Sequence, residues 1–106
     1  MNNFKIIYKI LASLEAQLDL DKTNIELISP AKLGISENRW RHFIQMLLDS
    51  GYIKGVKIYT DVTGETNVQC NDIGITLQGL EYLQENSTMQ QIKNALKGIK
   101  EITPGL

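Results

Sequence analysis

The sequence contains one cysteine, Cys70, one histidine, His42, and no long apolar run. A single cysteine cannot form an internal disulfide, which is typical of a reducing compartment. One His and one Cys are too few for a structural zinc site, which usually takes about four such ligands. No segment approaches the roughly 18 apolar residues that span a membrane, and lysines interrupt the apolar N-terminal stretch, unlike a signal peptide. We therefore expect a cytoplasmic protein with no metal and no cofactor.

The chain also lacks a net charge of either sign. Its 11 basic and 12 acidic residues give a formal charge of −1, so long-range attraction to nucleic acid or anionic membranes is not expected from the total. Any nucleic-acid contact must come from a local patch. The length of 106 residues and the apolar share of 42% predict one globular domain.

Motifs of catalysis are missing as well. The sequence has no Gly-x-Ser-x-Gly, no P-loop and no Gly-rich dinucleotide turn. With one histidine, acid–base chemistry would need carboxylate partners that the pattern does not place. We expect no enzyme activity and no catalytic residue.

Apolar residues at helical spacing predict a first helix over residues 3–18. The stripe that would face the core is Phe4, Ile7, Leu11, Leu14 and Leu18. Ile6 and Ile10 widen this stripe. They indicate either a central helix covered on two sides or a dimer interface.

The next segment predicts two helices joined by a tight turn. Residues 25–28, Ile-Glu-Leu-Ile, are expected to form a brief strand, and Ser29-Pro30 to begin a short helix ended by Gly34. Ser36 can cap a longer helix that continues to about Ser50 and presents Trp40, Ile44, Leu47 and Leu48 to the core. This arrangement is a helix-turn-helix.

Residues 52–61 and 66–70 predict two strands around a Thr63-Gly64-Glu65 turn, the wing of a winged helix. A helix should follow over about 75–84, with Thr76 as its cap and Leu77, Leu80 and Leu83 inward. Asn86-Ser87-Thr88 is expected to break it before a last helix at about 89–100. We predict a winged-helix domain at 1–86, a C-terminal helix at 87–101 packed on the core or on a dimer partner, and a tail at 102–106.

The predicted fold is mainly α (α+β): a winged helix-turn-helix with a three-helix core, a two-stranded wing and additional C-terminal helices. The sequence also resembles the YjcQ family of small bacterial and prophage proteins in the stretches FKIIYKIL (4–11), LGISE (33–37), GYIKGV (51–56) and ITLQGLEYL (75–83). The last stretch is similar to the Thr-x-x-Gly-x-x-Tyr-Leu segment that follows the wing in many winged-helix regulators. The resemblance implies a winged-helix fold and a phage-related setting.

A recognition helix presents the exposed residues of its N-terminal turns to base edges in the major groove. Counting from Ile44 as the buried centre, Asn38, Arg39 and His42 should point away from the core, with Arg41 and Gln45 on the flank. Asn and Arg suit adenine and guanine, since each can form two hydrogen bonds to a base edge. Lys32, Lys54 and Lys57 are candidates for phosphate contacts.

Local charge points in two directions. Residues 29–57 contain five basic and two acidic residues, a net of +3, whereas residues 58–87 contain five acidic residues and no Lys or Arg, a net of −5. Carboxylates at the wing tip disfavour insertion into a minor groove, which usually relies on Arg or Lys. The basic segment makes double-stranded DNA one expected partner, bound by a transcriptional regulator. The acidic segment favours the alternative, a protein–protein interaction module on the same scaffold that does not bind DNA.

A DNA-binding domain of this kind usually dimerises. The candidate interface is the stripe Met89, Ile92, Leu96 and Ile99. The same stripe could instead close the monomer core against the first helix, and the sequence does not choose between them.

Overall fold

The computed structural model describes the backbone of residues 2–97 and the side chains of residues 2–87. The element order is α1 (Asn3–Ala16), a 3-10 helix η1 (Ile25–Ile28), α2 (Pro30–Leu33), α3 (Glu37–Asp49), β1 (Ile53–Lys54), β2 (Lys57–Thr60), β3 (Thr66–Gln69), β4 (Gly74–Ile75) and α4 (Leu77–Lys97). This is an α+β fold of helices with two small antiparallel sheets, as expected at the level of fold class.

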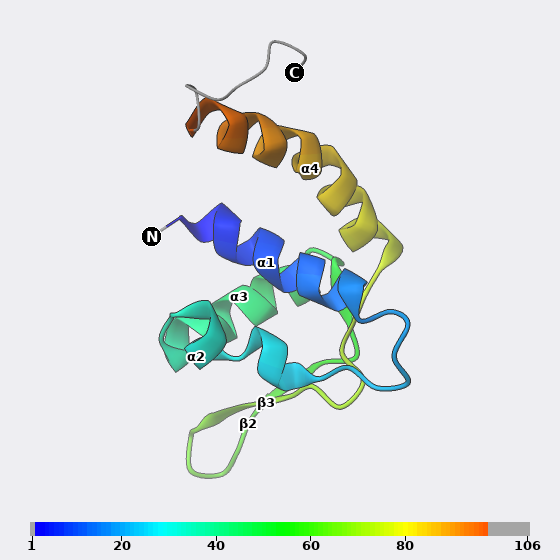
Figure 1. Cartoon of the computed structure of the whole chain (residues 1–106). Coiled ribbons are helices and arrows are strands. Elements are labelled where there is room, and N and C mark those ends of the chain that lie inside the picture. Colours follow the sequence, from blue (N-terminus) through cyan, green and yellow to red (C-terminus); the bar gives the residue numbers. More distant parts are fainter. Residues whose placement is uncertain (1, 98–106) are drawn as a thin grey trace.

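The helices form layers around α1. Figure 1 shows α1 lying between α4 on one side and α2 and α3 on the other. Its buried residues are Ile6, Ile10, Leu11 and Leu14, and they join the same hydrophobic cluster as Ile28, Ile44 and Ile75. Helix α1 is therefore the central element of the core.

This position decides between the two interpretations of Ile6 and Ile10. Both side chains are buried within the chain, so they serve the central helix and not a dimer interface. The stripe that we predicted for the core is partly wrong. Phe4 is 70% exposed and Leu18 is 56% exposed, because Phe4 lies in the first turn and Leu18 lies beyond the end of α1 at Ala16.

The expected strand at residues 25–28 is instead a 3-10 turn. The Asn24 side chain caps this turn by accepting a hydrogen bond from the Glu26 amide at 3.1 Å. Backbone hydrogen bonds between residues three apart close it, such as the one from the Leu27 amide to the Asn24 carbonyl. A segment of four residues with three apolar side chains is too short to reveal its period, so local hydrogen bonding decides between strand and 3-10 turn.

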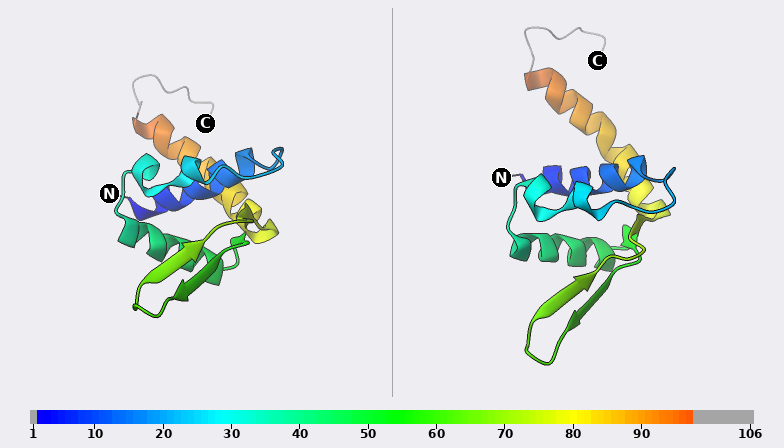
Figure 2. Two further views of the ribbon diagram at one scale, coloured as in Figure 1. Left: turned by 90° about the horizontal axis from the view of Figure 1, so that it is seen from below. Right: turned by 60° about the horizontal axis from the view of Figure 1, so that its bottom comes forward.

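Two strand pairs follow α3. The longer pair, β2 and β3, has Lys57 opposite Gln69 and Thr60 opposite Thr66, which confirms the predicted hairpin. It projects away from the helices, as Figure 2 shows. The shorter pair, β1 and β4, places Ile53 opposite Ile75 and was not predicted. It closes the base of the hairpin onto the core.

The last helix is one element where we predicted two. Helix α4 runs unbroken from Leu77 to Lys97, so the expected break at 86–88 is wrong. Asn86 donates to the Tyr82 carbonyl at 2.8 Å and Ser87 to the Gln84 carbonyl at 3.1 Å. Polar side chains that bond back onto the preceding turn can remain within a helix.

The start of α4 follows the prediction in two respects, its cap and two of its three inward leucines. The Thr76 hydroxyl accepts from the Gly79 amide at 3.1 Å, as a cap does. Leu80 and Leu83 pack against the core, but Leu77 is 75% exposed in the first position of the helix. The division into segments 1–86, 87–101 and 102–106 stays a prediction.

Candidate nucleic-acid interface

The turn between α2 and α3 forms as its sequence predicts. Gly34 has φ +70°, in the left-handed region that favours glycine. The Ile35 amide donates to the Pro30 carbonyl at 3.0 Å across this turn. The Ser36 hydroxyl then accepts from the Arg39 amide at 3.1 Å and begins α3. The two helices are consequently separate elements joined by a short glycine corner.

One face of α3 is fixed to the core. Phe43, Ile44 and Leu47 are buried, and Phe43 is an addition to the face that we predicted. Trp40 packs against the core as expected. Its indole Nε1 donates to the Ile28 carbonyl at 2.7 Å, so both rotation and translation of α3 are restricted near its N-terminal end.

The opposite face of the first turns is open to solvent. Asn38, Arg39 and His42 are exposed, which confirms the orientation that the helical count predicts. They line one cavity of about 290 Å³, together with Asn3, Ser36, Phe43 and Met46. The structure therefore brings together the three residues that we proposed for base contacts.

Arg39 has a neighbour that the sequence did not reveal. Its Nη1 donates to Oδ1 of Asn3 at 3.1 Å, across 36 positions of the chain. Asn3 lies in the first turn of α1, and only the packing of α1 against α3 places it there. Both side chains are exposed, so this bond can be exchanged for one to water or to a ligand.

The flanking residues are engaged within α3 itself. Arg41 donates to Oδ1 of Asn38 at 3.2 Å and lies 4.0 Å from a carboxylate oxygen of Glu37. Gln45 donates to Asp49 at 2.8 Å. Arg41 also borders a second cavity of about 250 Å³ with Thr66 and Asn67 of β3. Arg41 thus contacts Asn38 and also faces the hairpin.

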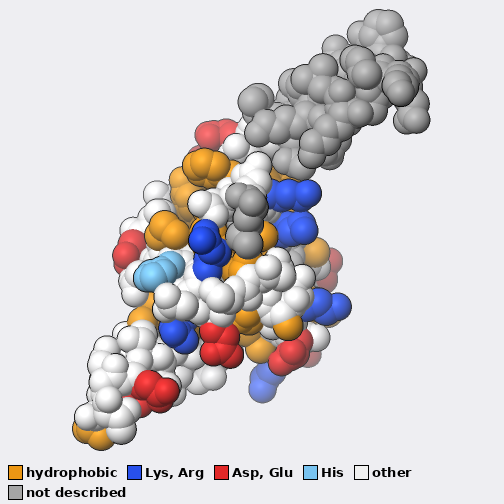
Figure 3. Space-filling model, turned by 90° about the vertical axis from the view of Figure 1, so that its left-hand side faces the viewer, with side chains coloured by type: hydrophobic (Ala, Val, Ile, Leu, Met, Phe, Trp, Pro, Cys, Tyr) orange, Lys and Arg blue, Asp and Glu red, His pale blue; other side chains and the backbone are white. Residues whose placement is uncertain are grey.

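The candidate phosphate contacts come from three different elements. Lys32 lies on α2, Lys54 on β1 and Lys57 on β2, and all three are exposed. Figure 3 shows Lys and Arg dispersed over one face of the molecule with Asp and Glu between them. On the face shown, the cations do not merge into one continuous basic patch.

The tip of the hairpin is organised by one carboxylate. Asp61 accepts from the Thr63 amide at 2.9 Å, the Glu65 amide at 3.1 Å and the Asn67 side chain at 3.0 Å. Hydrogen bonds from the Thr63 and Asn67 side chains are the main causes that lower the pKa of Asp61 below its ordinary value of 3.8. Asp61 is therefore ionised near neutral pH, and a negative charge lies beside the fully exposed Val62.

We also searched the described part of the chain for a reactive thiol, a metal site and a membrane-spanning helix. Burial raises the pKa of the half-buried Cys70 thiol, which disfavours the reactive thiolate. Among the side chains of residues 2–87, no three His, Cys, Asp or Glu are grouped as metal ligands would be. No helix within residues 2–97 has both the length and the apolar character needed to cross a membrane.

The predicted dimer residues fall at the margin of the structure. Positions 89, 92 and 96 are on the described backbone of α4, but the side chains of Met89, Ile92 and Leu96 lie outside the described part, as does all of Ile99. Their role as an interface remains a prediction.

Comparison with known proteins gave one result. A family model described as YjcQ protein matches residues 8–102, which is most of the chain. Comparison with curated proteins and comparison with solved structures gave no match.

Proposed function

The chain belongs to the YjcQ family, and from the geometry of this member we propose that it is a winged-helix domain that binds duplex DNA through α3. In this proposal the protein is a cytoplasmic transcriptional regulator of phage or prophage type and has no catalytic activity. The order of short helix, glycine turn, longer helix and antiparallel hairpin supports the winged-helix assignment.

The observation that carries the proposal is the two-sided character of α3. Its inner face is anchored by Phe43, Ile44 and the Trp40 indole. Its outer face exposes Asn38, Arg39 and His42 in the first two turns. A recognition helix needs both properties, because base-edge hydrogen bonds require side chains placed on a rigid element.

The hairpin has a limited role in this proposal. Its tip combines Asp61 and Glu65 with no cation, so phosphates repel it. Lys57 lies at the other end of β2, near the base of the hairpin, where a phosphate contact would avoid that repulsion. Together with Lys32, Lys57 would position α3 without choosing a sequence.

Selection from a pool of random duplexes at low salt tests the proposal, followed by fluorescence-anisotropy titration of the selected duplex. Arg39→Ala should lower affinity for the selected site by about 1–3 kcal/mol while leaving affinity for unrelated duplexes nearly unchanged. Lys57→Ala should weaken both equally, and the complex should weaken as salt rises.

Lys22→Ala is a charge-matched control. Lys22 is exposed in the loop between α1 and η1, at the opposite end of the molecule from the α2–α3 turn (Figure 1). This variant should bind as the wild type does. If Arg39→Ala weakened every duplex equally, base reading by α3 would be wrong.

A second function is favoured by the wing. Asp61 and Glu65 flank Val62 at the tip, and Tyr59 is 45% exposed on β2, a combination suited to a protein partner with a basic rim. Failure to detect any DNA complex at low salt would favour this protein-interaction module over the DNA-binding domain.

A further inference from the structure

The Arg39 guanidinium is bound by a residue from a different element of the fold. Its Nη1 donates to Oδ1 of Asn3 at 3.1 Å, and Asn3 is the first residue of α1. Both residues line the cavity of about 290 Å³ beside the exposed face of α3. The start of α1 therefore belongs to the same surface as the residues that we propose for base contacts.

The first turn of α1 is well anchored. Asn2 caps the helix, since its side chain accepts hydrogen bonds from the Phe4 and Lys5 amides at 3.0 and 3.2 Å. Ile6, one turn into the helix, is buried in the core. Asn3 is consequently presented by an ordered helical turn, which gives its amide oxygen a defined place.

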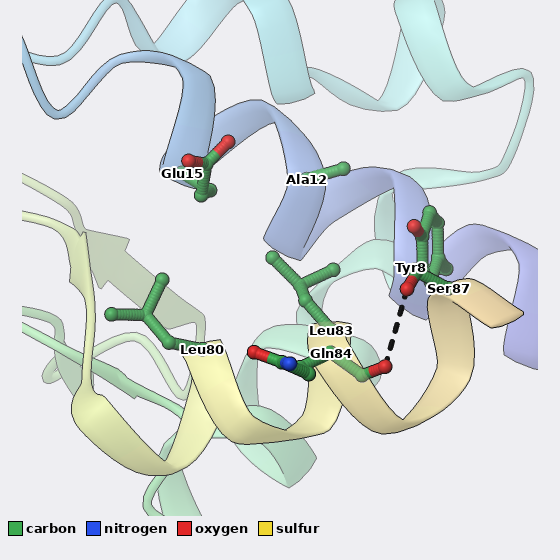
Figure 4. A pocket seen from close by; sticks show the side chains of 7 residues that line it. All are labelled: Tyr8, Ala12, Glu15, Leu80, Leu83, Gln84 and Ser87. Atoms are coloured by element: carbon green, nitrogen blue, oxygen red, sulfur yellow. Dashed lines mark hydrogen bonds between the residues drawn. The ribbon is translucent and has the colours of Figure 1, made fainter.

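Helix α4 supports α1 from the side opposite to α3 (Figure 1). Leu80 and Leu83 of α4 line the groove between these two helices together with Ala12 of α1, as Figure 4 shows. Both leucines also pack against the hydrophobic core. Helix α1 is thus held between α4 and α3, so the first turn of α1 keeps its place relative to α3.

The acceptor on Asn3 is neutral, which preserves the charge of Arg39. An amide oxygen orients a guanidinium without cancelling its charge. Arg41 differs in this respect, because it lies 4.0 Å from the Glu37 carboxylate of its own helix. Among the side chains of residues 2–87, Arg39 has no carboxylate partner. Arg39 therefore keeps its full attraction for acceptor atoms on DNA.

The bond to Asn3 also leaves the other donors of Arg39 free. A guanidinium presents its N–H groups in a rigid planar fork, and Nη1 uses one of them for Asn3. The edge formed by Nε and Nη2 remains for two parallel bonds to O6 and N7 of a guanine. Arginine has a long side chain with many rotamers, and restricting it before binding lowers the entropic cost of those bonds.

We propose that Asn3 is a positioning residue, whose amide oxygen holds the Arg39 guanidinium in the orientation in which α3 reads a guanine. This inference rests on the proposed DNA-binding function and adds α1 to the elements that determine sequence preference. Asn3 acts through Arg39 and does not itself contact DNA. Because an exposed hydrogen bond competes with water, its loss affects preference more than stability.

NMR relaxation of the Arg39 side chain in the free full-length protein tests the positioning without DNA. The Nε–H order parameter of Arg39 should be lower in Asn3→Ala than in the wild type. Asn3→Asp keeps an acceptor oxygen on a side chain of the same length and should retain the wild-type value. Equal order parameters in the wild type and Asn3→Ala would overturn the proposal, whether or not the protein binds DNA.

Fluorescence-anisotropy titration of the selected duplex and of an unrelated duplex tests the effect on preference. Asn3→Ala should lower the ratio of the two affinities about two- to tenfold, the effect of leaving one long side chain unrestrained before binding. In the Arg39→Ala background, the same substitution should have no further effect on the ratio. Asn3→Asp should keep the ratio, while its negative charge weakens both complexes.

Asn2→Ala is the matched control. Asn2 is the neighbouring exposed asparagine, and its side chain caps α1. Its replacement should lower the urea midpoint of unfolding and leave the ratio of affinities unchanged. Asn3→Ala should do the reverse. Equal changes of the ratio in both variants would assign the effect to the stability of α1 and overturn the positioning role.

The remaining outcomes separate this inference from the function on which it rests. A wild type that prefers no duplex would remove the proposed function and this inference with it. A preference that depends on Arg39 but not on Asn3 would overturn this inference alone. A loss in Asn3→Ala that persists in the Arg39→Ala background would make Asn3 a direct DNA contact, which also contradicts a positioning role.

Discussion

The indole nitrogen of Trp40 on α3 donates a hydrogen bond of 2.7 Å to the backbone carbonyl of Ile28 at the end of η1. Ile28 is fully buried, so this bond satisfies a carbonyl in a place that water does not reach. It also joins the helix that presents Arg39 to the segment that leads into α2. The placement of the candidate interface thus depends on a contact between residues 12 positions apart.

Trp40→Phe should destabilise the fold by about 1–3 kcal/mol, because the Ile28 carbonyl loses its partner while most of the apolar contact remains. Urea unfolding followed by circular dichroism measures this change. Tyr59→Phe, which removes a hydroxyl from an exposed aromatic, is the control and should be neutral. Equal stability of both variants would show that the indole bond contributes nothing.

Ser36→Ala should destabilise the protein by about 1 kcal/mol, since the Arg39 amide at the start of α3 loses its acceptor. Ser36→Asp should recover most of this loss, because a carboxylate caps well and favours the positive end of the helix. Thermal unfolding of the three proteins compares them. A Ser36→Asp variant no more stable than Ser36→Ala would contradict a capping role.

Gly79→Ala should lower the stability of the fold, although it adds only one methyl group. A Cβ at this position would lie 2.4 Å from the Tyr52 carbonyl oxygen and 2.5 Å from Cγ1 of Ile75. Because the oxygen is backbone, α4 must shift, at a cost of about 1–3 kcal/mol. Glu81→Ala, at an exposed site two residues along α4, is the matched control for urea unfolding. If Gly79→Ala were as stable as Glu81→Ala, this close approach of α4 to Tyr52 and β4 would be wrong.

Acid should loosen the tip of the hairpin. Because the pKa of Asp61 is lowered below 3.8 in the folded state, its ionised form supports the turn above that value, and the support is lost as pH falls through the folded pKa. NMR titration of the Asp61 carboxyl carbon should give a midpoint below 3.8, with the Thr63 and Glu65 amide signals moving together with it. A midpoint at or above 3.8 would mean that these hydrogen bonds do not form in solution.

The elements with strong local signals were predictable. Gly34 and Ser36 fix the end of one helix and the start of the next through their own backbone and side-chain bonds. The Thr63-Gly64 turn between the β2 and β3 strands is likewise local, with Gly64 at φ +85°. The exposure of Asn38, Arg39 and His42 followed from helical spacing alone.

The wrong predictions concern features that tertiary contacts determine, such as which face of a helix is buried. Both stripes of α1 are apolar, and only the positions of its neighbours select Ile6 and Ile10 over Phe4. Asn86 and Ser87 looked like a break, but each bonds to a carbonyl of the preceding turn within α4. The Arg39–Asn3 bond joins residues 36 apart, and no pattern in one sequence reveals such a pair.

The central claim is that α3 contacts DNA through the face of Asn38, Arg39 and His42, and NMR mapping of the labelled full chain with a selected duplex tests it most directly. The account predicts that the amide signals of these three residues shift most and that Gly64 at the hairpin tip shifts little. Shifts concentrated at Gly64 or on α4, or no shift at low salt, would contradict it.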